Sequence, residues 1–484
     1  VRIVLGRHVP QNLNTLLSLL DFGLDDEPLI SEKKVSYKGE PVAAVIAESE
    51  RQARDAVAKV RVDWEELPAV FDVEEAVKPG APVVNEVYPK NLFVYHGKYD
   101  HQKLRFGDVE TAFSQADKII EGRYQMSPIE QAPTETCGAI AAPETNDRYV
   151  CYTSTQALFF SLDTSSKLLK LPSNRMHFIG GTVGGGFGGK VDSLHEPMAI
   201  LGAMLTGRPC KYIFDREEEM QVGAPRGAER WYLKDGVMND GRIVARKFVG
   251  YFDSGAYTRL SSYAIIKSVG HLPGPYTIPN VYADVYCVFT NRTPATAMRG
   301  FGITGVDFAI ETHMDKVAYA VGMDPIELRI LNAYRDGDMK AHRRLAKNTA
   351  LIECCHVAAE KAKWPISQKA KQASSLRDGG GERAKIPNYT ALDQNGLVTG
   401  YAAQGYARKS KSSQPAPAPA PSAAPPPMPR HETAQVTPRY EPQRTQPQPV
   451  AAPPPPPPPP APPATPAEQR RVTRFSSISG LRRR

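Results

Sequence analysis

The chain has 484 residues, enough for two or three domains, and no run of about 18 apolar residues that would predict a membrane span. Its formal charge is +8, but residues 401–484 hold twelve basic and three acidic residues, so residues 1–400 carry only −1. The basic charge therefore belongs to the C-terminal region, and nothing in the globular part predicts a nucleic-acid partner.

The chain starts at Val1 without a methionine or a signal-peptide pattern, and we expect that it lacks its natural start. No CxxC pair occurs among the cysteines, which disfavours a zinc ribbon or an iron–sulfur binding run. Free thiols in a reducing, cytoplasmic compartment are the expectation. The six cysteines are Cys137, Cys151, Cys210, Cys287, Cys354 and Cys355.

The N-terminal region predicts a strand, a helix and a second strand. Pro41–Ala47 is an apolar run suited to a buried strand. Ser49, with Gln52 three residues later, has the pattern of a capping box, and apolar residues follow at helical spacing. The extended pattern resumes at Arg61–Trp64. We expect this unit to be structural.

Further along the chain, Asp108 is expected to cap a second helix, and a strand follows through Ile119 toward Tyr124. An extended segment at Met176–Ile179 and a helix at Ser193–Leu205 are predicted on the two sides of a glycine-rich loop. The clearest late helix carries apolar residues from Ile310 to Val321. The region after residue 375 is Pro-rich and predicts disorder, because it cannot bury enough apolar surface to offset its ordering entropy.

The loop at residues 184–190 reads GGGFGGK, and its glycines allow the backbone to approach a ligand closely. Taken alone it leaves several interpretations open. It contains GxGxxG, typical of a dinucleotide site, with Asp215 as the nearest acid at a strand end. It also contains most of a P-loop, although Val191 stands where a magnesium-binding Ser or Thr is needed. A purely structural turn is the remaining interpretation.

The loop belongs to an ordered set of motifs. Thr155-Gln156 precedes it, and residues 297–302 (AMRGFG) follow it. Together with residues 214–219, 253–258 and the region from Asp26 to Trp64, these motifs resemble the molybdopterin-binding large subunit of xanthine dehydrogenase/aldehyde oxidase-type molybdenum hydroxylases. The resemblance covers roughly residues 25–375. It implies an α+β fold: a partial α/β-hammerhead domain at 1–75, the first molybdopterin-binding domain at 76–375, and a low-complexity tail at 376–484.

The resemblance also implies the cofactor-binding residues. In such enzymes molybdopterin holds the molybdenum and no protein side chain ligates it, so no metal ligand is expected here. Gln156 matches a glutamine whose amide donates toward a molybdenum oxygen, although a strand-end glutamine without a role is the alternative. The other matching positions lie in the two loops. They are Gly186, Phe187, Gly188, Arg299 and Gly300.

Three positions match substrate-facing residues of the family. Phe301 matches an aromatic that packs on the substrate ring, although an ordinary core phenylalanine is the alternative. Val191 stands where purine-hydroxylating relatives have a glutamate, and Lys267 stands where they have an arginine. Lysine keeps the charge but loses the planar, bidentate fork of arginine. Both departures weigh against xanthine as the substrate. The alternative interpretation of Lys267 is an exposed lysine without a role.

One feature of the family has no match. The glutamate that acts as general base lies in a second cofactor-binding domain, which we expect to be missing, so no catalytic residue is assigned. Glu196-Pro197 matches it only superficially and is interpreted as part of a helix. The resemblance implies that this chain alone is inactive. It also implies partner subunits carrying 2Fe-2S clusters and FAD, assembled as a dimer of heterotrimers.

The expected function is hydroxylation of aldehydes or N-heterocycles by a subunit that binds molybdenum-molybdopterin, in the plain or the cytosine dinucleotide form. A non-catalytic remnant is the alternative. A third hypothesis makes the Pro-rich, basic tail an interaction module for SH3-type grooves or anionic partners. A plain solvated tail is the simpler interpretation of that segment.

Overall fold

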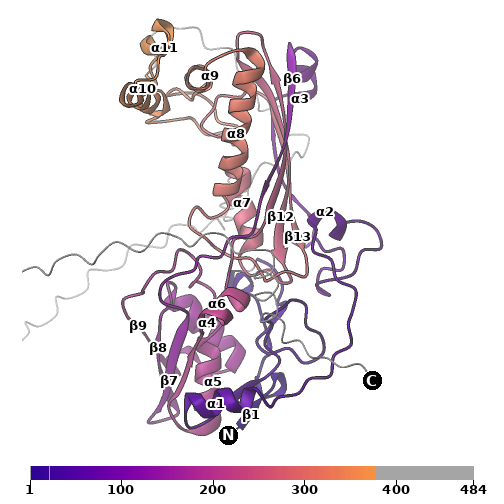
Figure 1. The fold of residues 1–484 in the computed structure, drawn as a ribbon, viewed down its shortest axis with the longest axis vertical. Helices are drawn as coiled ribbons and strands as arrows, with labels where there is room; N and C mark the ends of the chain where they lie inside the picture. The colour runs from indigo at the N-terminus through magenta and orange to yellow at the C-terminus, as the bar shows by residue number, and fades with distance from the viewer. Residues whose placement is uncertain (1, 21, 377–484) are drawn as a thin grey trace, which may run out of the picture. The chain divides into compact units, whose positions relative to one another are not determined.

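The computed structural model describes residues 2–20 and 22–376 (Figure 1). The tail predicted at 376–484 therefore lies, apart from its first residue, outside the described residues. The rest is a mixture of helices and sheets, as predicted. No helix within the described ranges combines the length and the apolar character that crossing a membrane requires.

A five-stranded sheet forms the main scaffold, in the order β5-β13-β12-β11-β6. Neighbouring strands are antiparallel except for β12 and β13, which are parallel. The strand predicted from Ile119 toward Tyr124 is β6, at the sheet edge. The strands are β5 (Gln102–Phe106), β6 (Lys118–Met126), β11 (Glu229–Val237), β12 (Ile243–Gly255) and β13 (Val281–Phe289).

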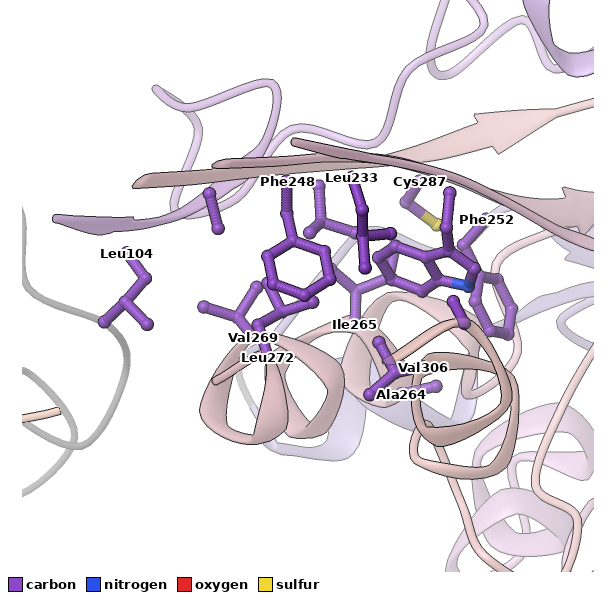
Figure 2. Packing of buried hydrophobic residues seen from close by; sticks show 14 of the residues in the cluster. Leu104, Leu233, Phe248, Phe252, Ala264, Ile265, Val269, Leu272, Cys287 and Val306 are labelled. Carbon is purple, nitrogen blue, oxygen red and sulfur yellow. The ribbon is translucent and has the colours of Figure 1, made fainter. Parts of the chain in front are cut away.

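The largest core lies between this sheet and two helices, α7 (Ser261–His271) and α8 (Thr304–Val321). Figure 2 shows Phe248 and Leu233 of the sheet pointing toward Ile265 of α7. The late helix predicted from its apolar spacing is α8, and it ends at Gly322, whose φ of 70° suits glycine. This core fixes β13 and α8, the elements that precede and follow the loop at residues 297–302.

A second, four-stranded sheet has the order β10-β7-β8-β9, with β8 and β9 parallel. Helices α4 (Leu158–Leu169) and α5 (Glu196–Thr206) pack on it around a smaller core. The predicted helix at 193–205 is α5, which begins three residues later than expected. The strands are β7 (Gly138–Glu144), β8 (Arg148–Thr153), β9 (Met176–Gly180) and β10 (Cys210–Ile213).

The N-terminal strand–helix–strand prediction is correct in two of its three parts. The predicted strand shortens to β4 (Ala44–Ile46), which is half-buried and pairs with β1 (Arg2–Val4). Helix α1 (Glu50–Val57) begins after Ser49, whose side chain accepts from the Gln52 amide. The prediction of a second strand was wrong, because Arg61–Trp64 pairs with no strand and Trp64 is exposed. Without a neighbouring backbone, an extended segment gains no ladder hydrogen bonds.

The remaining elements are short. Asp108 caps α3 through the Thr111 amide, as predicted. A small helical group follows α8 and has its own core. These elements are β2 (Leu13–Asn14), β3 (Glu27–Pro28), α2 (Val73–Ala76), α3 (Val109–Ser114), α6 (Arg216–Val222), α9 (Pro325–Asn332), α10 (Leu351–Ala362), α11 (Gln368–Gln372), and the 3-10 helices η1 (Gly6–His8), η2 (Leu16–Leu20) and η3 (Ser173–Arg175).

Candidate functional site

The glycine loop leaves the end of β9 and leads to α5, the strand-to-helix setting that its sequence predicts. Glu135 holds its two ends together. The carboxylate accepts from the Gly184 amide at 2.7 Å and from Lys190 Nζ at 2.7 Å. Lys190 is fully buried, so this ion pair is a strong local constraint on the loop. The loop lysine therefore has a structural partner.

The middle of the loop adopts conformations that favour glycine. Phe187 has a φ of 54° and Gly188 a φ of 100°. A Cβ on Gly186 would lie 2.4 Å from the Gln156 side chain, and one on Gly188 would lie 2.6 Å from the Ala297 carbonyl. A side chain at Gly188 would meet the Ala297 backbone, whereas one at Gly186 would have to displace the Gln156 side chain.

Gln156 lies directly against this loop. Its Oε1 accepts from the Gly188 amide at 2.9 Å and from the Lys190 amide at 3.3 Å. The residue is exposed, and the structure records no hydrogen bond from its side-chain nitrogen to the described residues. The glutamine is thus held by its oxygen and keeps an N–H₂ group available for a ligand.

The loop at 297–302 joins the glycine loop by a backbone hydrogen bond. The Arg299 amide donates to the Phe187 carbonyl at 2.7 Å. Arg299 and Gly300 are exposed, and Phe187 exposes 46% of its surface. The structure therefore brings the six predicted cofactor-binding residues together: Gln156, Phe187, Arg299 and Gly300 are exposed, Gly188 is half-buried and Gly186 is buried.

Two residues that the sequence motifs did not single out hold the second loop in place. Arg226 donates to the Arg299 carbonyl and, at 3.2 Å, to the Gly300 carbonyl. Gln131 donates to the Ala297 carbonyl at 2.8 Å and lies against Gly189. Both lie far from the loops in sequence and belong to no motif, so only the folded chain reveals them.

Glu229 is a further buried acid in this region. Burial raises its pKa to about 7, although Trp231 and Arg226 both oppose the shift. One carboxylate oxygen accepts from Trp231 Nε1 at 2.9 Å and lies close to the Gly305 backbone at the start of α8. Glu229 therefore faces the helix that follows the second loop.

The three predicted substrate residues are connected by one apolar cluster and one tyrosine ring. Val191 and Phe301 belong to the same apolar cluster, built around Leu16, Leu17 and Leu260. Phe301 packs against Tyr263 with ring centroids 6.1 Å apart. Lys267 is exposed and places its Nζ 5.0 Å from the same tyrosine ring. Tyr263, which the sequence did not indicate, thus contacts both Phe301 and Lys267.

Two acids with competing interpretations have structural partners. Asp215 caps α6 and forms a capping box with Glu218. Glu196, which was predicted to be a helix residue, is the first residue of α5 and is fully buried. Its carboxylate accepts from Thr153 and Ser161, both at 2.9 Å.

In the described part of the chain, no cluster of three or more His, Cys, Asp or Glu side chains could hold a metal ion. All six cysteines are free thiols.

Comparison with protein families identifies the class of this fold and site. Residues 87–333 match the molybdopterin cofactor-binding domain. Residues 1–68 match the a/b hammerhead domain of aldehyde oxidase and xanthine dehydrogenase. The chain belongs to the molybdopterin-binding xanthine oxidase family.

Individual relatives agree with this assignment. The chain is 32% identical over 343 residues to the nicotinate dehydrogenase large molybdopterin subunit of Eubacterium barkeri, covering 70% of this chain and 78% of the relative. It is 31% identical over 358 residues to aldehyde oxidase 1 of Bos taurus, covering 73% of this chain and 25% of the relative. The solved aldehyde oxidoreductase of Desulfovibrio gigas has a TM-score of 0.71 at 26% identity, over 77% of this chain and 41% of that one.

Proposed function

We propose that this chain is the molybdenum-cofactor-binding subunit of an oxidoreductase that hydroxylates aldehydes or N-heterocycles. The observation that carries the proposal is the hydrogen bond from the Arg299 amide to the Phe187 carbonyl, which joins the two loops beside Gln156. One cofactor could touch both loops only if they are adjacent. The names of the relatives, which include a nicotinate dehydrogenase and aldehyde oxidases, support the reaction class.

The residues present fit a molybdopterin. Gly186 and Gly188 leave no room for a Cβ, so the loop is close-packed on its inner side while Phe187 remains exposed on the other. The Gln156 amide nitrogen is free among the described residues and can donate to an oxygen of the cofactor. When bound, the cofactor would supply the two-electron redox chemistry. The chain's own residues would bind and orient it.

The substrate would lie on the apolar side of the loops, where Phe301 and Val191 share a cluster. Phe301 offers a ring face for stacking, and Lys267 offers a single cationic donor at the rim. We propose that electrons leave to 2Fe-2S and FAD centres on partner subunits in a cytoplasmic heterotrimer that dimerises. The nicotinate dehydrogenase relative is itself named as a large subunit, which supports such an assembly.

The general base would come from a further polypeptide segment. Glu135 is engaged with Lys190 and the Gly184 amide, and Glu196, at the start of α5, is engaged with two buried hydroxyls. Neither faces the apolar cluster as a free carboxylate. This arrangement supports a subunit that binds cofactor and is inactive alone.

Molybdenum content tests the proposal. The chain should be expressed in a host that makes molybdopterin, and molybdenum per chain measured by mass spectrometry. Gly188→Ala should reduce the content at least tenfold, because alanine meets both a φ of 100° and the Ala297 carbonyl. Gly181→Ala is the matched control, since nothing lies within 4 Å of that Cβ.

A wild-type chain without molybdenum under these conditions, or equal content in the two variants, would contradict the proposal. The first result would favour the alternative, a non-catalytic remnant.

The interaction role of the tail is a separate hypothesis. A pull-down with and without residues 401–484 tests it, and equal recovery of partners from both forms would contradict it.

A further inference from the structure

A small cavity lies apart from the two loops, behind the segment that joins the glycine loop to α5. Its volume is about 50 Å³. That is room for about three or four water-sized occupants and far below the roughly 300 Å³ that an organic ligand needs. Its walls come from the N-terminal strands, α4, the end of β10 and residues 192–194. Any occupant is therefore an ion or water.

Four side-chain oxygens of residues that line the cavity lack hydrogen-bond partners among the described residues. Asp192 Oδ2, Asn14 Oδ1, Thr164 Oγ1 and Ser193 Oγ are buried and have no hydrogen-bond partner among the described residues. Asp192 exposes 5% and Thr164 only 1% of its surface. Buried polar atoms are nearly always paired, so four unpaired oxygens on residues that line one cavity point to a bound species that pairs them.

The charge balance of the cavity leaves one negative charge over. Arg259, the cation in the wall, pairs with Glu27 at 2.9 Å and donates to the Gly223 carbonyl at 2.9 Å. No ion pair within 4.0 Å connects it to Asp192 in the described structure. Burial raises the pKa of Asp192 to about 6, although Arg259 and Thr296 lower it. Above pH 7 the carboxylate is therefore mostly ionised and lacks a direct cationic partner.

We propose that this cavity binds one alkali cation, Na⁺ or K⁺, through Asp192 and the three neutral oxygens. One carboxylate with amide and hydroxyl oxygens matches a hard ion of charge +1. A divalent ion would leave excess positive charge beside Arg259. The described residues also offer no cluster of three or more His, Cys, Asp or Glu for such an ion.

The ion would connect three separate parts of the fold. Asn14 lies in β2, Thr164 in α4, and Asp192 with Ser193 directly after Val191. Binding would hold the segment between the glycine loop and α5 in one conformation, because all three parts would share a ligand. Cation binding in this cavity would stabilise the folded chain whether or not the cofactor is bound.

The test is the melting temperature of the purified full chain at pH 8 in equal concentrations of NaCl, KCl or choline chloride. Choline is too large for the cavity and keeps the ionic strength equal. Na⁺ or K⁺ should raise the Tm by at least about 2 °C relative to choline, since a ligand bound only by the folded state stabilises it. Whichever salt gives the larger shift identifies the preferred ion.

Variants assign the shift to the cavity. Asp192→Asn should abolish the cation dependence, and Thr164→Val should reduce it by at least half. Asp163→Asn removes the same charge from an exposed neighbouring position on α4 and should keep the full shift. Crystals soaked in Rb⁺ should show anomalous scattering in the cavity.

Equal Tm values in the three salts for the wild-type chain would overturn the proposal, as would an unchanged shift in Asp192→Asn. If Asp192→Asn does not fold, Thr164→Val decides, and a full shift in that variant contradicts the site. Ordered water with a protonated Asp192 is the outcome that a cation-independent Tm would indicate.

Discussion

Arg226 is the residue whose contacts best explain how the second loop keeps its conformation. Its guanidinium is buried and donates to two successive carbonyls, of Arg299 and Gly300, that point away from the loop surface. Two parallel donors in one plane fix both the position and the orientation of a peptide segment. The exposed amide of Arg299 can then reach the Phe187 carbonyl.

Replacing Arg226 by glutamine should therefore release the loop. We expect Arg226→Gln to destabilise the chain by about 2–3 kcal/mol, because hydrogen bonds from a charged donor contribute about 1.5–3 kcal/mol. Arg226→Lys can donate to one carbonyl at a time, so its free energy of unfolding should lie between those of the wild-type chain and Arg226→Gln. Amide hydrogen exchange of residues 299–302 should speed up in both variants. Unchanged exchange there, with only a lower Tm, would show that Arg226 is a general core residue.

Val191 and Lys267 predict the substrate preference of the holoenzyme. Val191 offers no acceptor for a purine edge, and Lys267 lacks the fork of an arginine. In a reconstituted holoenzyme we expect kcat/KM for xanthine to be about 10⁴-fold below that for an aldehyde or a simple N-heterocycle. Val191→Glu should narrow this gap, with Val191→Gln as the matched uncharged control. Efficient xanthine turnover by the unaltered enzyme would refute the interpretation of both positions.

The sequence indicates a residue of the candidate site only where that residue lies within a local motif. Gln156 and Phe301 lie within short motifs, so their neighbours in sequence identify them. Arg226, Gln131 and Tyr263 act across more than 30 residues of sequence through hydrogen bonds or ring packing. A contact of that kind leaves no local pattern, and only the folded chain shows it.

At the scale of elements, a buried polar network connects the sheet to α8. Arg246 of β12 donates to both Asp235 oxygens of β11, at 2.8 and 2.6 Å, and both side chains are fully buried. His313 of α8 lies 3.6 Å from the same carboxylate and 2.7 Å from the Tyr124 hydroxyl of β6. The network sets the register of the helix on the sheet, since a shift would leave a buried charge unpaired.

This network predicts an acid sensitivity. Burial, with Arg246 and Lys316 nearby, lowers the pKa of His313 to about 4, although Asp235 opposes the shift. The unfolded chain takes up the proton near pH 6.5, whereas the folded chain resists it until about pH 4. Stability should therefore fall as the pH drops from 6.5 to 4, by about 3 kcal/mol from this residue.

His313→Asn removes this titration and keeps a polar group near Tyr124. Between pH 6.5 and 4 its free energy of unfolding should decline less steeply than that of the wild-type chain, in urea titrations at fixed ionic strength. His177→Asn, at an exposed position, is the control and should keep the wild-type slope. Parallel slopes for wild type and His313→Asn would contradict the assignment.

Elements with a local signal were predicted well, and those that depend on distant partners were not. Caps and apolar spacing located α1, α3 and α8 to within a few residues, apart from the start of α8, which extends six residues before Ile310. Arg61–Trp64 has a strand-like pattern but no strand beside it. Sheet membership requires a partner backbone, and a single segment of sequence does not contain that information.

At the scale of the whole molecule, the similarity covers very different shares of the relatives. It spans 78% of the nicotinate dehydrogenase subunit but 25% of bovine aldehyde oxidase 1. The part of this chain that matches them carries the two loops and the apolar cluster. Under the proposed function, cofactor binding and substrate orientation reside in this part, while the general base and the electron-transfer centres would come from other polypeptide segments.

The last prediction follows from that division. Purified alone and supplied with cofactor, this chain should show no hydroxylase activity, because a missing general base costs about 10²–10⁴ in rate and both Glu135 and Glu196 are engaged in hydrogen bonds. Exposed apolar side chains, among them Phe187 of the glycine loop at 46% and Phe159 of α4 at 80% exposure, should also favour aggregation. Steady-state assays with an aldehyde and an N-heterocycle, together with light scattering, measure both effects.

Co-expression with the complementary part of a relative provides the positive control, and activity should appear only then. The opposite result would be a monodisperse chain with near-stoichiometric molybdenum that oxidises either substrate by itself. A carboxylate of this chain would then have to act as base. Glu196→Gln would be the first variant to make, because its second carboxylate oxygen is buried without a partner among the described residues. Loss of activity in that variant, with the fold intact, would make Glu196 the base and would remove the need for a second chain in proton transfer.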